Sequence, residues 1–133
     1  RPTAVWHPGP SRDHWWNWLP PEQKEQIAKN DFFSYVDVRD VCEAVLLGLV
    51  APVSGHEAFL LTADDTTSDR PSEELVEAYY LSLPWPKISR EEYFSGQPYR
   101  SLVDCRKAKR LLGWSPRFSR RDPAAGYLKE DHG

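Results

Sequence analysis

One loop gathers side chains that could contact a small molecule. Residues 7–18 contain His7, His14, Trp15, Trp16 and Trp18, with prolines and a glycine that interrupt regular structure. Tryptophan faces match the apolar faces of sugar rings, and both histidines could touch a substrate there. The alternative is that the tryptophans anchor the loop and the histidines are ordinary surface or core residues. No neighbouring His, Cys or carboxylate makes a metal site with them, so we expect no metal.

A second cluster is basic. Residues 100–121 hold eight Lys or Arg side chains and one acidic side chain, Asp104. This excess could contact nucleic acid. The basic side chains at 106–110, however, fall on the solvent side of an expected amphipathic helix, and no aromatic side chain among them offers a stacking platform for nucleobases. The whole chain carries a net charge of −3. We therefore expect a solvated basic face and no nucleic-acid partner.

The cysteines and the hydropathy bear on location. Cys42 and Cys105 lie far apart, in expected helices, without metal-ligand spacing. The best apolar run, residues 41–50, is well short of the roughly 18 residues that a membrane-spanning helix needs. We expect reduced thiols, a cytoplasmic location and no membrane partner. The chain of 133 residues starts with Arg1 and contains no Met, so we also expect it to be a piece of a longer protein.

The elements that would position these residues alternate between strand and helix. Residues 32–38 are rich in aromatic and β-branched side chains and predict a strand. Asp37 can cap the following helix, whose residues 41–50 are apolar on nearly every side. Residues 57–63 form a continuous apolar run, typical of a strand inside a parallel sheet. Strand, helix and strand predict a parallel crossover unit.

The rest of the chain predicts shorter elements. A short exposed helix is expected at 22–29, a helix with an apolar stripe at 71–83, and a short strand at 99–103. We expect a last helix with Asp104 as its cap and with Ala108, Leu111 and Leu112 facing inward. Gly113 should end this helix in the left-handed conformation, so that Trp114 can pack back over the last turn. We expect residues 117–133 to be a loose tail because they contain few apolar side chains.

Three segments, taken in order, carry a resemblance to a known family. They are RPTAVWHPG at 1–9, YVDVRDVCEAVLLGL at 35–49 and SLVDCRKAKRLLGWSP at 101–116. Together they resemble the last half of an extended short-chain dehydrogenase/reductase, the NAD(P)-dependent epimerase/dehydratase family. The resemblance implies an α/β fold, the C-terminal part of a Rossmann-like enzyme, with residues 1–116 as its substrate-binding portion.

Two motifs of that family are absent from the sequence. No glycine-rich turn follows an expected strand, and no tyrosine has a lysine four residues on. In the family the glycine-rich turn binds the dinucleotide and the tyrosine serves as acid or base. We therefore expect no catalytic residue in this chain, no activity of the chain alone, and NAD or NADP bound mostly outside it.

The resemblance also implies candidate contacts. Arg100 stands where family members often place an arginine that faces an anionic group of the substrate, although it could be a plain surface arginine. Pro2 and Thr3 follow the strand that leads past the nicotinamide and are cofactor candidates through shape and backbone. Ala4 and the pair Phe33 and Ser34 replace polar residues that nucleotide-sugar members use. We therefore expect a smaller sugar, sugar acid or other hydroxy or keto compound as substrate.

The sequence thus predicts the substrate-binding portion of an NAD(P)-dependent epimerase, dehydratase or oxidoreductase. The alternative is a non-catalytic binding or interaction module derived from the same fold. Because the helix at 41–50 needs cover on more than one side, we further expect a homo-oligomer.

Overall fold

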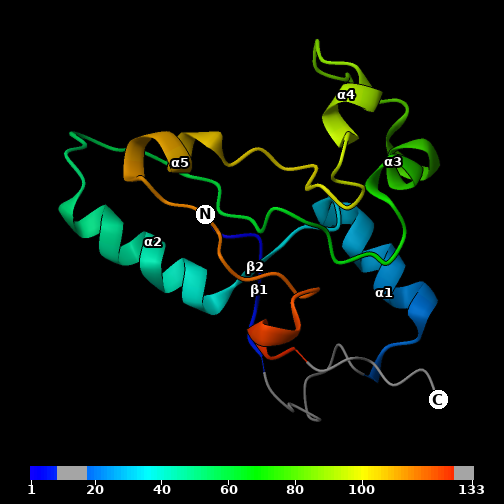
Figure 1. Cartoon of the computed structure of the whole chain (residues 1–133), viewed down its shortest axis with the longest axis horizontal. Helices are drawn as coiled ribbons and strands as arrows, with labels where there is room; N and C mark the ends of the chain where they lie inside the picture. The colour runs from blue at the N-terminus through cyan, green and yellow to red at the C-terminus, as the bar shows by residue number, and fades with distance from the viewer. Residues whose placement is uncertain (9–17, 128–133) are drawn as a thin grey trace.

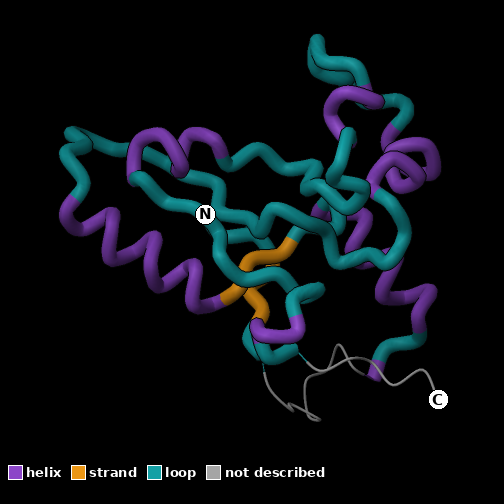
Figure 2. Tube along the Cα trace, viewed as in Figure 1, coloured by secondary structure: helices purple, strands orange, loops and turns teal. Residues whose placement is uncertain are grey.

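A short parallel pairing lies at the centre of the fold. Strand β1 (Ala4–Trp6) pairs with β2 (Tyr35–Asp37), with Ala4 opposite Tyr35 and Trp6 opposite Asp37. Figure 2 shows these strands where the helical and loop segments meet. The structure is a computed structural model that describes residues 1–8 and 18–127. The predicted strand at 32–38 is shortened at its start, because Phe32 and Phe33 have φ angles of 55° and 53°, which a β-strand cannot contain.

Asp37 joins β2 to helix α2 (Val38–Val50). Its extended backbone makes it the N-cap, and its Oδ1 accepts a hydrogen bond from the backbone N–H of Arg39 at 2.8 Å. A carboxylate at this end also complements the partial positive charge of the helix N-terminus. The predicted cap is therefore confirmed.

The prediction of a strand at residues 57–63 is wrong in its extent. Leu61 forms a single parallel bridge with Pro2, and Ala63 N–H donates to the carbonyl of Tyr35 at 2.6 Å. The segment thus runs extended beside the chain start and then beside β2. This segment bonds first to residues 1–3 and then to β2, so its row of hydrogen bonds with either neighbour is too short for a β-strand. The parallel crossover through α2 is nevertheless present.

The core lies between α2, this extended segment and helix α5 (Arg106–Leu112). It contains Val36, Ala44, Leu61, Cys105, Ala108, Leu112 and Trp114. Gly113 has a φ of 65° and ends α5 in the left-handed conformation, as predicted. Trp114 is fully buried, as an indole packed back on a helix end would be. Leu111 was expected to face inward but is 36 % exposed, because Ala108 and Leu112 occupy the inner side of a helix of two turns.

A second group of helices stands beside this core. It comprises α1 (Pro21–Ala28) with the short 3₁₀ turn η2 (Lys29–Asp31), α3 (Ser72–Leu75) continued by the π-helical turn η3 (Val76–Tyr80), and α4 (Arg90–Phe94). Figure 1 shows α1, α3 and α4 on one side of the strands and α2 and α5 on the other. The predicted helix at 71–83 ends at Tyr80, and the predicted strand at 99–103 is reduced to one antiparallel bridge between Arg100 and Asp65.

The expectation of a loose tail from residue 117 is wrong for residues 117–127. This segment packs against β2 and α2 and contains the 3₁₀ turn η4 (Pro123–Ala125), in which Ala125 is buried. Backbone hydrogen bonds to buried side chains, rather than apolar burial, hold it, which explains why its composition predicted looseness. Residues 128–133 lie outside the described part of the chain.

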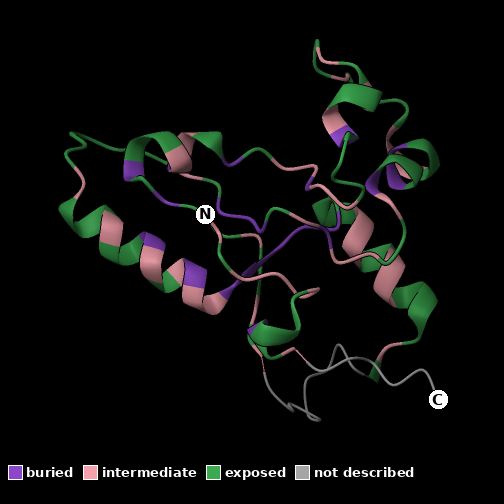
Figure 3. Ribbon diagram, viewed as in Figure 1, coloured by how far each residue is buried: buried purple, intermediate pink, exposed green. Residues whose placement is uncertain are grey.

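One side of α2 is exposed and apolar. Val45, Leu46, Leu49 and Val50 are between 58 % and 79 % exposed, and Figure 3 shows exposed surface reaching the far end of the helix. Cys42 lies on α2 and is exposed, whereas Cys105 precedes α5 and is buried; both thiols are free. Within residues 1–8 and 18–127, no helix has the length and apolarity to cross a membrane.

Candidate functional site

A cavity of about 1120 Å³ lies between the two groups of helices. Ala63, Asp64 and Asp65 form part of its wall, at the carboxyl end of the extended segment that runs parallel to β1. The cavity therefore begins where this extended segment ends.

The cavity is lined by charged and aromatic side chains. The basic ones are Arg100, Arg106, Lys109, Arg117 and Arg121; the acidic ones are Asp64, Asp65 and Asp104. The aromatic ones are Phe32, Tyr80, Trp85, Tyr93, Tyr99 and Phe118. A volume of this size and a wall of aromatic rings with a few charges are typical of a site for a small organic ligand.

Most of these cations already have a carboxylate partner. Lys109 pairs with Asp64 at 2.8 Å, Arg106 with Asp104 at 2.7 Å and Arg121 with Asp65 at 2.7 Å. Arg117 forms an ion pair with Glu43, which does not line the cavity. These four cations are locally neutralised.

Arg100 differs from them. Its Nη1 donates to the backbone carbonyl of Tyr93 at 3.0 Å, and its Cζ lies 4.1 Å from the centre of the Tyr93 ring. Among the described residues no carboxylate pairs with it. The guanidinium therefore keeps its positive charge and further N–H donors available to an anion in the cavity.

The pKa shifts of the lining residues fix their charge states. Burial lowers the pKa of Lys109, but the hydrogen bond to Asp64 and the charge of Asp64 together outweigh burial, and the net shift is upward. The hydrogen bond from Arg106 lowers the pKa of Asp104 despite its burial. Burial raises the pKa values of Tyr93 and Cys105. Each of these shifts moves away from neutral pH, so these groups suit ligand binding rather than proton transfer near pH 7.

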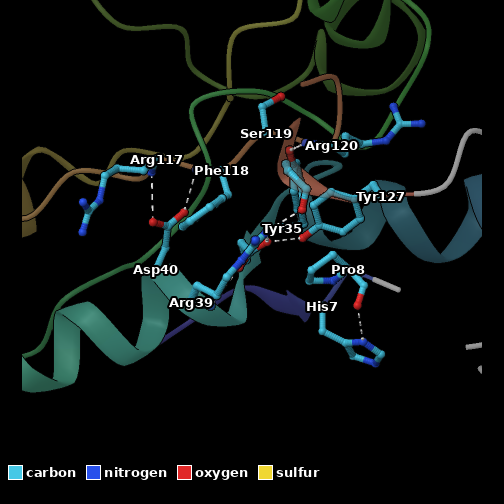
Figure 4. A network of polar contacts seen from close by, with 12 residues as sticks. His7, Pro8, Tyr35, Arg39, Asp40, Arg117, Phe118, Ser119, Arg120 and Tyr127 are labelled. Carbon is cyan, nitrogen blue, oxygen red and sulfur yellow. Dashed lines mark hydrogen bonds and ion pairs between the residues drawn. The ribbon is translucent and has the colours of Figure 1, made fainter. Parts of the chain in front are cut away.

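The C-terminal segment forms one wall of the cavity and is held by Asp40. The buried carboxylate of Asp40 accepts hydrogen bonds from the backbone N–H groups of Arg117 at 2.9 Å and Phe118 at 3.1 Å, as Figure 4 shows. The indole Nε1 of Trp114 donates to the backbone carbonyl of Asp40 at 2.9 Å. Burial raises the pKa of Asp40, although both N–H groups act in the opposite direction. One acidic residue of α2 thus holds two residues of the wall, Arg117 and Phe118, and also the buried indole of Trp114.

Tyr35 and Asp65 hold the next part of the same wall. The Tyr35 hydroxyl donates to Asp65 at 2.7 Å and accepts from the backbone N–H of Arg120 at 2.7 Å. Asp65 also accepts from the hydroxyl of Ser119 at 2.6 Å and from Arg121 at 2.7 Å. Burial and the neighbouring Asp65 charge raise the pKa of Tyr35, so the phenol stays protonated and acts as a fixed support.

Asp37 completes the set of contacts to this segment. Its Oδ2 accepts from the hydroxyl of Tyr127 at 2.7 Å and pairs with Arg39 at 2.8 Å. The guanidinium of Arg39 lies 3.6 Å from the centre of the Phe118 ring. Tyr35 and Arg39, four residues apart, have separate partners.

The structure places the predicted contact residues in different regions. Arg100 lines the cavity, whereas Pro2, Thr3 and His7 do not. His7 is exposed and its Nδ1 lies 3.3 Å from the carbonyl of Pro8 (Figure 4). His14 and Trp15 lie outside the described residues. Trp18 is 71 % exposed and lies away from the cavity lining.

Neither the chain start at Pro2 and Thr3 nor the start of α2 fits the pyrophosphate of a dinucleotide. Pro2 has no N–H, and both the N–H and the hydroxyl of Thr3 donate to the carbonyl of Leu61, at 3.1 and 3.2 Å. At the junction of β2 and α2 the carboxylate of Asp37 occupies the helix start, where a phosphate would be repelled. No group of three His, Cys, Asp or Glu side chains within the described ranges is arranged to hold a metal ion.

Several cavity residues were missed by the sequence analysis. Trp85, which lies between two prolines, and Asp64 and Asp65 are not among the predicted contacts, and Lys109 belongs to the basic face that was predicted to be solvated. An aromatic residue flanked by prolines was the one available signal, because the partners of the others are 30 or more positions away.

Comparison of the chain with protein-family models, with curated proteins and with solved structures finds no significant match.

Proposed function

We propose that this chain is the substrate-binding portion of an NAD(P)-dependent epimerase, dehydratase or oxidoreductase, and that its cavity receives a sugar acid. Arg100 would bind the carboxylate of the substrate. The observation that carries the proposal is that Arg100, unlike the other cations of the cavity, has no carboxylate partner among the described residues.

The shape and charge of Arg100 favour a carboxylate. A guanidinium presents parallel N–H groups that match the two oxygens of a carboxylate, and one pair of this kind binds more strongly than a neutral hydrogen bond. Tyr93 holds the guanidinium from one side through its carbonyl and its ring. A preorganised cation loses little conformational entropy when the ligand binds.

The chemistry of the enzyme would require a cofactor that accepts hydride from a substrate hydroxyl when bound. The residues of this chain would bind and orient the substrate, exclude water from the cavity and hold their protons near pH 7. Because the chain lacks a glycine-rich turn and a Tyr-x-x-x-Lys pair, we expect substrate binding by the chain without turnover.

A non-catalytic binding module is the second candidate. It is favoured by one observation, namely that the charged and aromatic side chains of the cavity all come from residues 32–121 of this chain. The two candidates differ in their response to the dinucleotide. A substrate-binding portion binds the acid and leaves NAD and NADP to residues elsewhere, and only in the complete enzyme is the bound acid oxidised.

Isothermal titration calorimetry of the chain with D-glucuronate and with D-glucose tests the proposal. We expect glucuronate to bind and glucose to bind at least about tenfold more weakly, because it lacks the charged group. Arg100→Met should remove this preference. Arg110→Met is the matched control, because Arg110 lies exposed on α5 outside the cavity lining. Equal binding of acid and sugar, or equal effects of the two substitutions, would contradict the proposal.

A further inference from the structure

We propose that Trp85 is the surface on which the ring of the bound acid stacks, so that the cavity selects cyclic over open-chain acids. The inference rests on the proposed function and adds a specificity-determining residue to it. Within residues 1–8 and 18–127, Trp85 is the one tryptophan that lines the cavity.

The indole of Trp85 is held in place by its surroundings. Its Nε1 donates to the backbone carbonyl of Ile88 at 2.8 Å, which satisfies the polar atom of the ring within the protein. The rings of Tyr93 and Phe94 contact it at centroid distances of 5.6 and 5.8 Å. Arg90, from outside the cavity lining, lies 5.5 Å from its centroid. A fixed aromatic ring with a satisfied N–H offers an apolar surface at low entropic cost.

Trp85 and Arg100 both contact the aromatic ring of Tyr93. Tyr93 has the guanidinium of Arg100 4.1 Å from its centre and meets the indole of Trp85 edge-on at 5.6 Å. A ligand that contacts both groups must therefore extend past the ring of Tyr93. In the arrangement that we propose, its carboxylate lies at Arg100 and its sugar ring at Trp85.

The chemistry of the ring favours a pyranose. One side of a pyranose ring exposes several C–H groups, and the face of an indole carries the negative part of its quadrupole, which attracts them. An open-chain hydroxy acid of the same charge has no such flat apolar side. Discrimination between the two should therefore depend on Trp85, whereas binding of both depends on Arg100.

The test uses two acids of equal charge and carbon number, D-glucuronate, which closes to a ring, and D-gluconate, which is open. Calorimetry with the wild-type chain and with Trp85→Leu measures both affinities. We expect Trp85→Leu to weaken glucuronate about five- to tenfold and to leave gluconate within about twofold. Trp85→Phe keeps an aromatic face and should retain most of the preference. Thermal unfolding of each variant checks that the α4 region stays folded.

Saturation-transfer NMR gives a second readout that does not depend on a substitution. Ring protons of glucuronate should receive strong saturation from aromatic protons of the wild-type chain, and gluconate protons should receive little. Equal losses for the two acids in Trp85→Leu, or no loss for either, would overturn the inference and leave Arg100 as the anion site. Failure of the wild-type chain to bind either acid would instead overturn the proposed function.

Discussion

The carboxylate of Asp40 accepts a hydrogen bond from the backbone N–H of Arg117 at 2.9 Å, although the two residues are 77 positions apart. The first lies in the opening turn of α2 and the second in the wall of the cavity. The acidic residues of the β2 and α2 segment thus bind the C-terminal segment in addition to capping a helix. Stability and the shape of the cavity are linked here, because the contacts that hold Arg117 and Phe118 also form part of the cavity wall.

Replacing Asp40 should destabilise the protein strongly. Asp40→Ala removes the acceptor of two backbone N–H groups in a buried place, and we expect a loss of about 2 to 4 kcal/mol in the free energy of unfolding. Asp122→Ala is the control, since Asp122 caps the exposed turn η4 and should cost about 1 kcal/mol. Denaturation in urea measures both, and a similar small loss for the two variants would contradict the role given to Asp40.

The pH dependence of stability should have two parts with opposite signs. Burial raises the pKa of Asp40 above its ordinary value of 3.8, so the folded state binds this proton more tightly than the unfolded state does. Its contribution to stability therefore falls as pH rises from about 3.8 through the folded-state pKa. Asp40→Asn should flatten that decline.

Asp37 should act in the other direction. Burial opposes its ionisation, but hydrogen bonds from Arg39 and Tyr127 outweigh burial and hold its pKa below 3.8. Its contribution is present above 3.8 and is lost as pH falls through the folded-state pKa. In the Asp37→Asn variant, the free energy of unfolding should therefore fall less on acidification than in the wild-type chain. Thermal unfolding between pH 2.5 and about 7 separates the two variants, and parallel profiles would contradict both assignments.

Tyr35 should support the cavity wall through its hydroxyl. Tyr35→Phe leaves the ring in place but removes the bonds to Asp65 and to the N–H of Arg120, and we expect a cost of about 1 to 3 kcal/mol. Tyr99→Phe is the matched control, because the Tyr99 ring that stacks on Arg121 is retained. A surface-like effect, within about 0.5 kcal/mol, is expected for it. Equal costs for the two variants would contradict the support role.

Self-association through α2 stays a prediction. Leu46 and Leu49 are 65 % and 78 % exposed on the same side of the helix, and such a surface favours association. Light scattering should find a dimer or higher oligomer for the wild-type chain and a monomer for the variant with both Leu46→Glu and Leu49→Glu. Leu81→Glu, at an exposed leucine elsewhere, should leave the oligomer intact. A wild-type monomer at high dilution would contradict the prediction.

Features set by local sequence could be predicted. The cap at Asp37 and the end of α5 at Gly113 depend on residues within a turn of each other, so composition and spacing were enough. The strand at residues 57–63 was predicted from its apolar run, but a strand also needs a partner of matching length, and here the neighbour changes after Thr3. Partners far along the chain do not appear in a local pattern.

The candidate site likewise combines features that nearby residues predict with features that depend on distant partners. Arg100 became a candidate through a motif-level resemblance. The property that sets it apart, that no carboxylate of residues 1–8 and 18–127 pairs with it, is visible only when Asp64, Asp65 and Asp104 are seen beside the other cations. Trp15 was a predicted contact because it stands in a cluster of aromatic residues, and Trp85 was not among the predictions. The contact of Trp85 with Tyr93, and of Tyr93 with Arg100, depends on how residues 84–100 fold back on themselves.

The most direct measurement is an NMR titration that follows the arginine Nε–H resonances of the chain as D-glucuronate is added. If the cavity binds the acid through the guanidinium of Arg100, the Arg100 resonance shifts saturably, the Arg110 resonance does not, and D-glucose leaves both in place. If Arg100 does not respond, or if all arginines shift together with the ionic strength, then the cavity is not an acid-binding site and the proposed function is wrong.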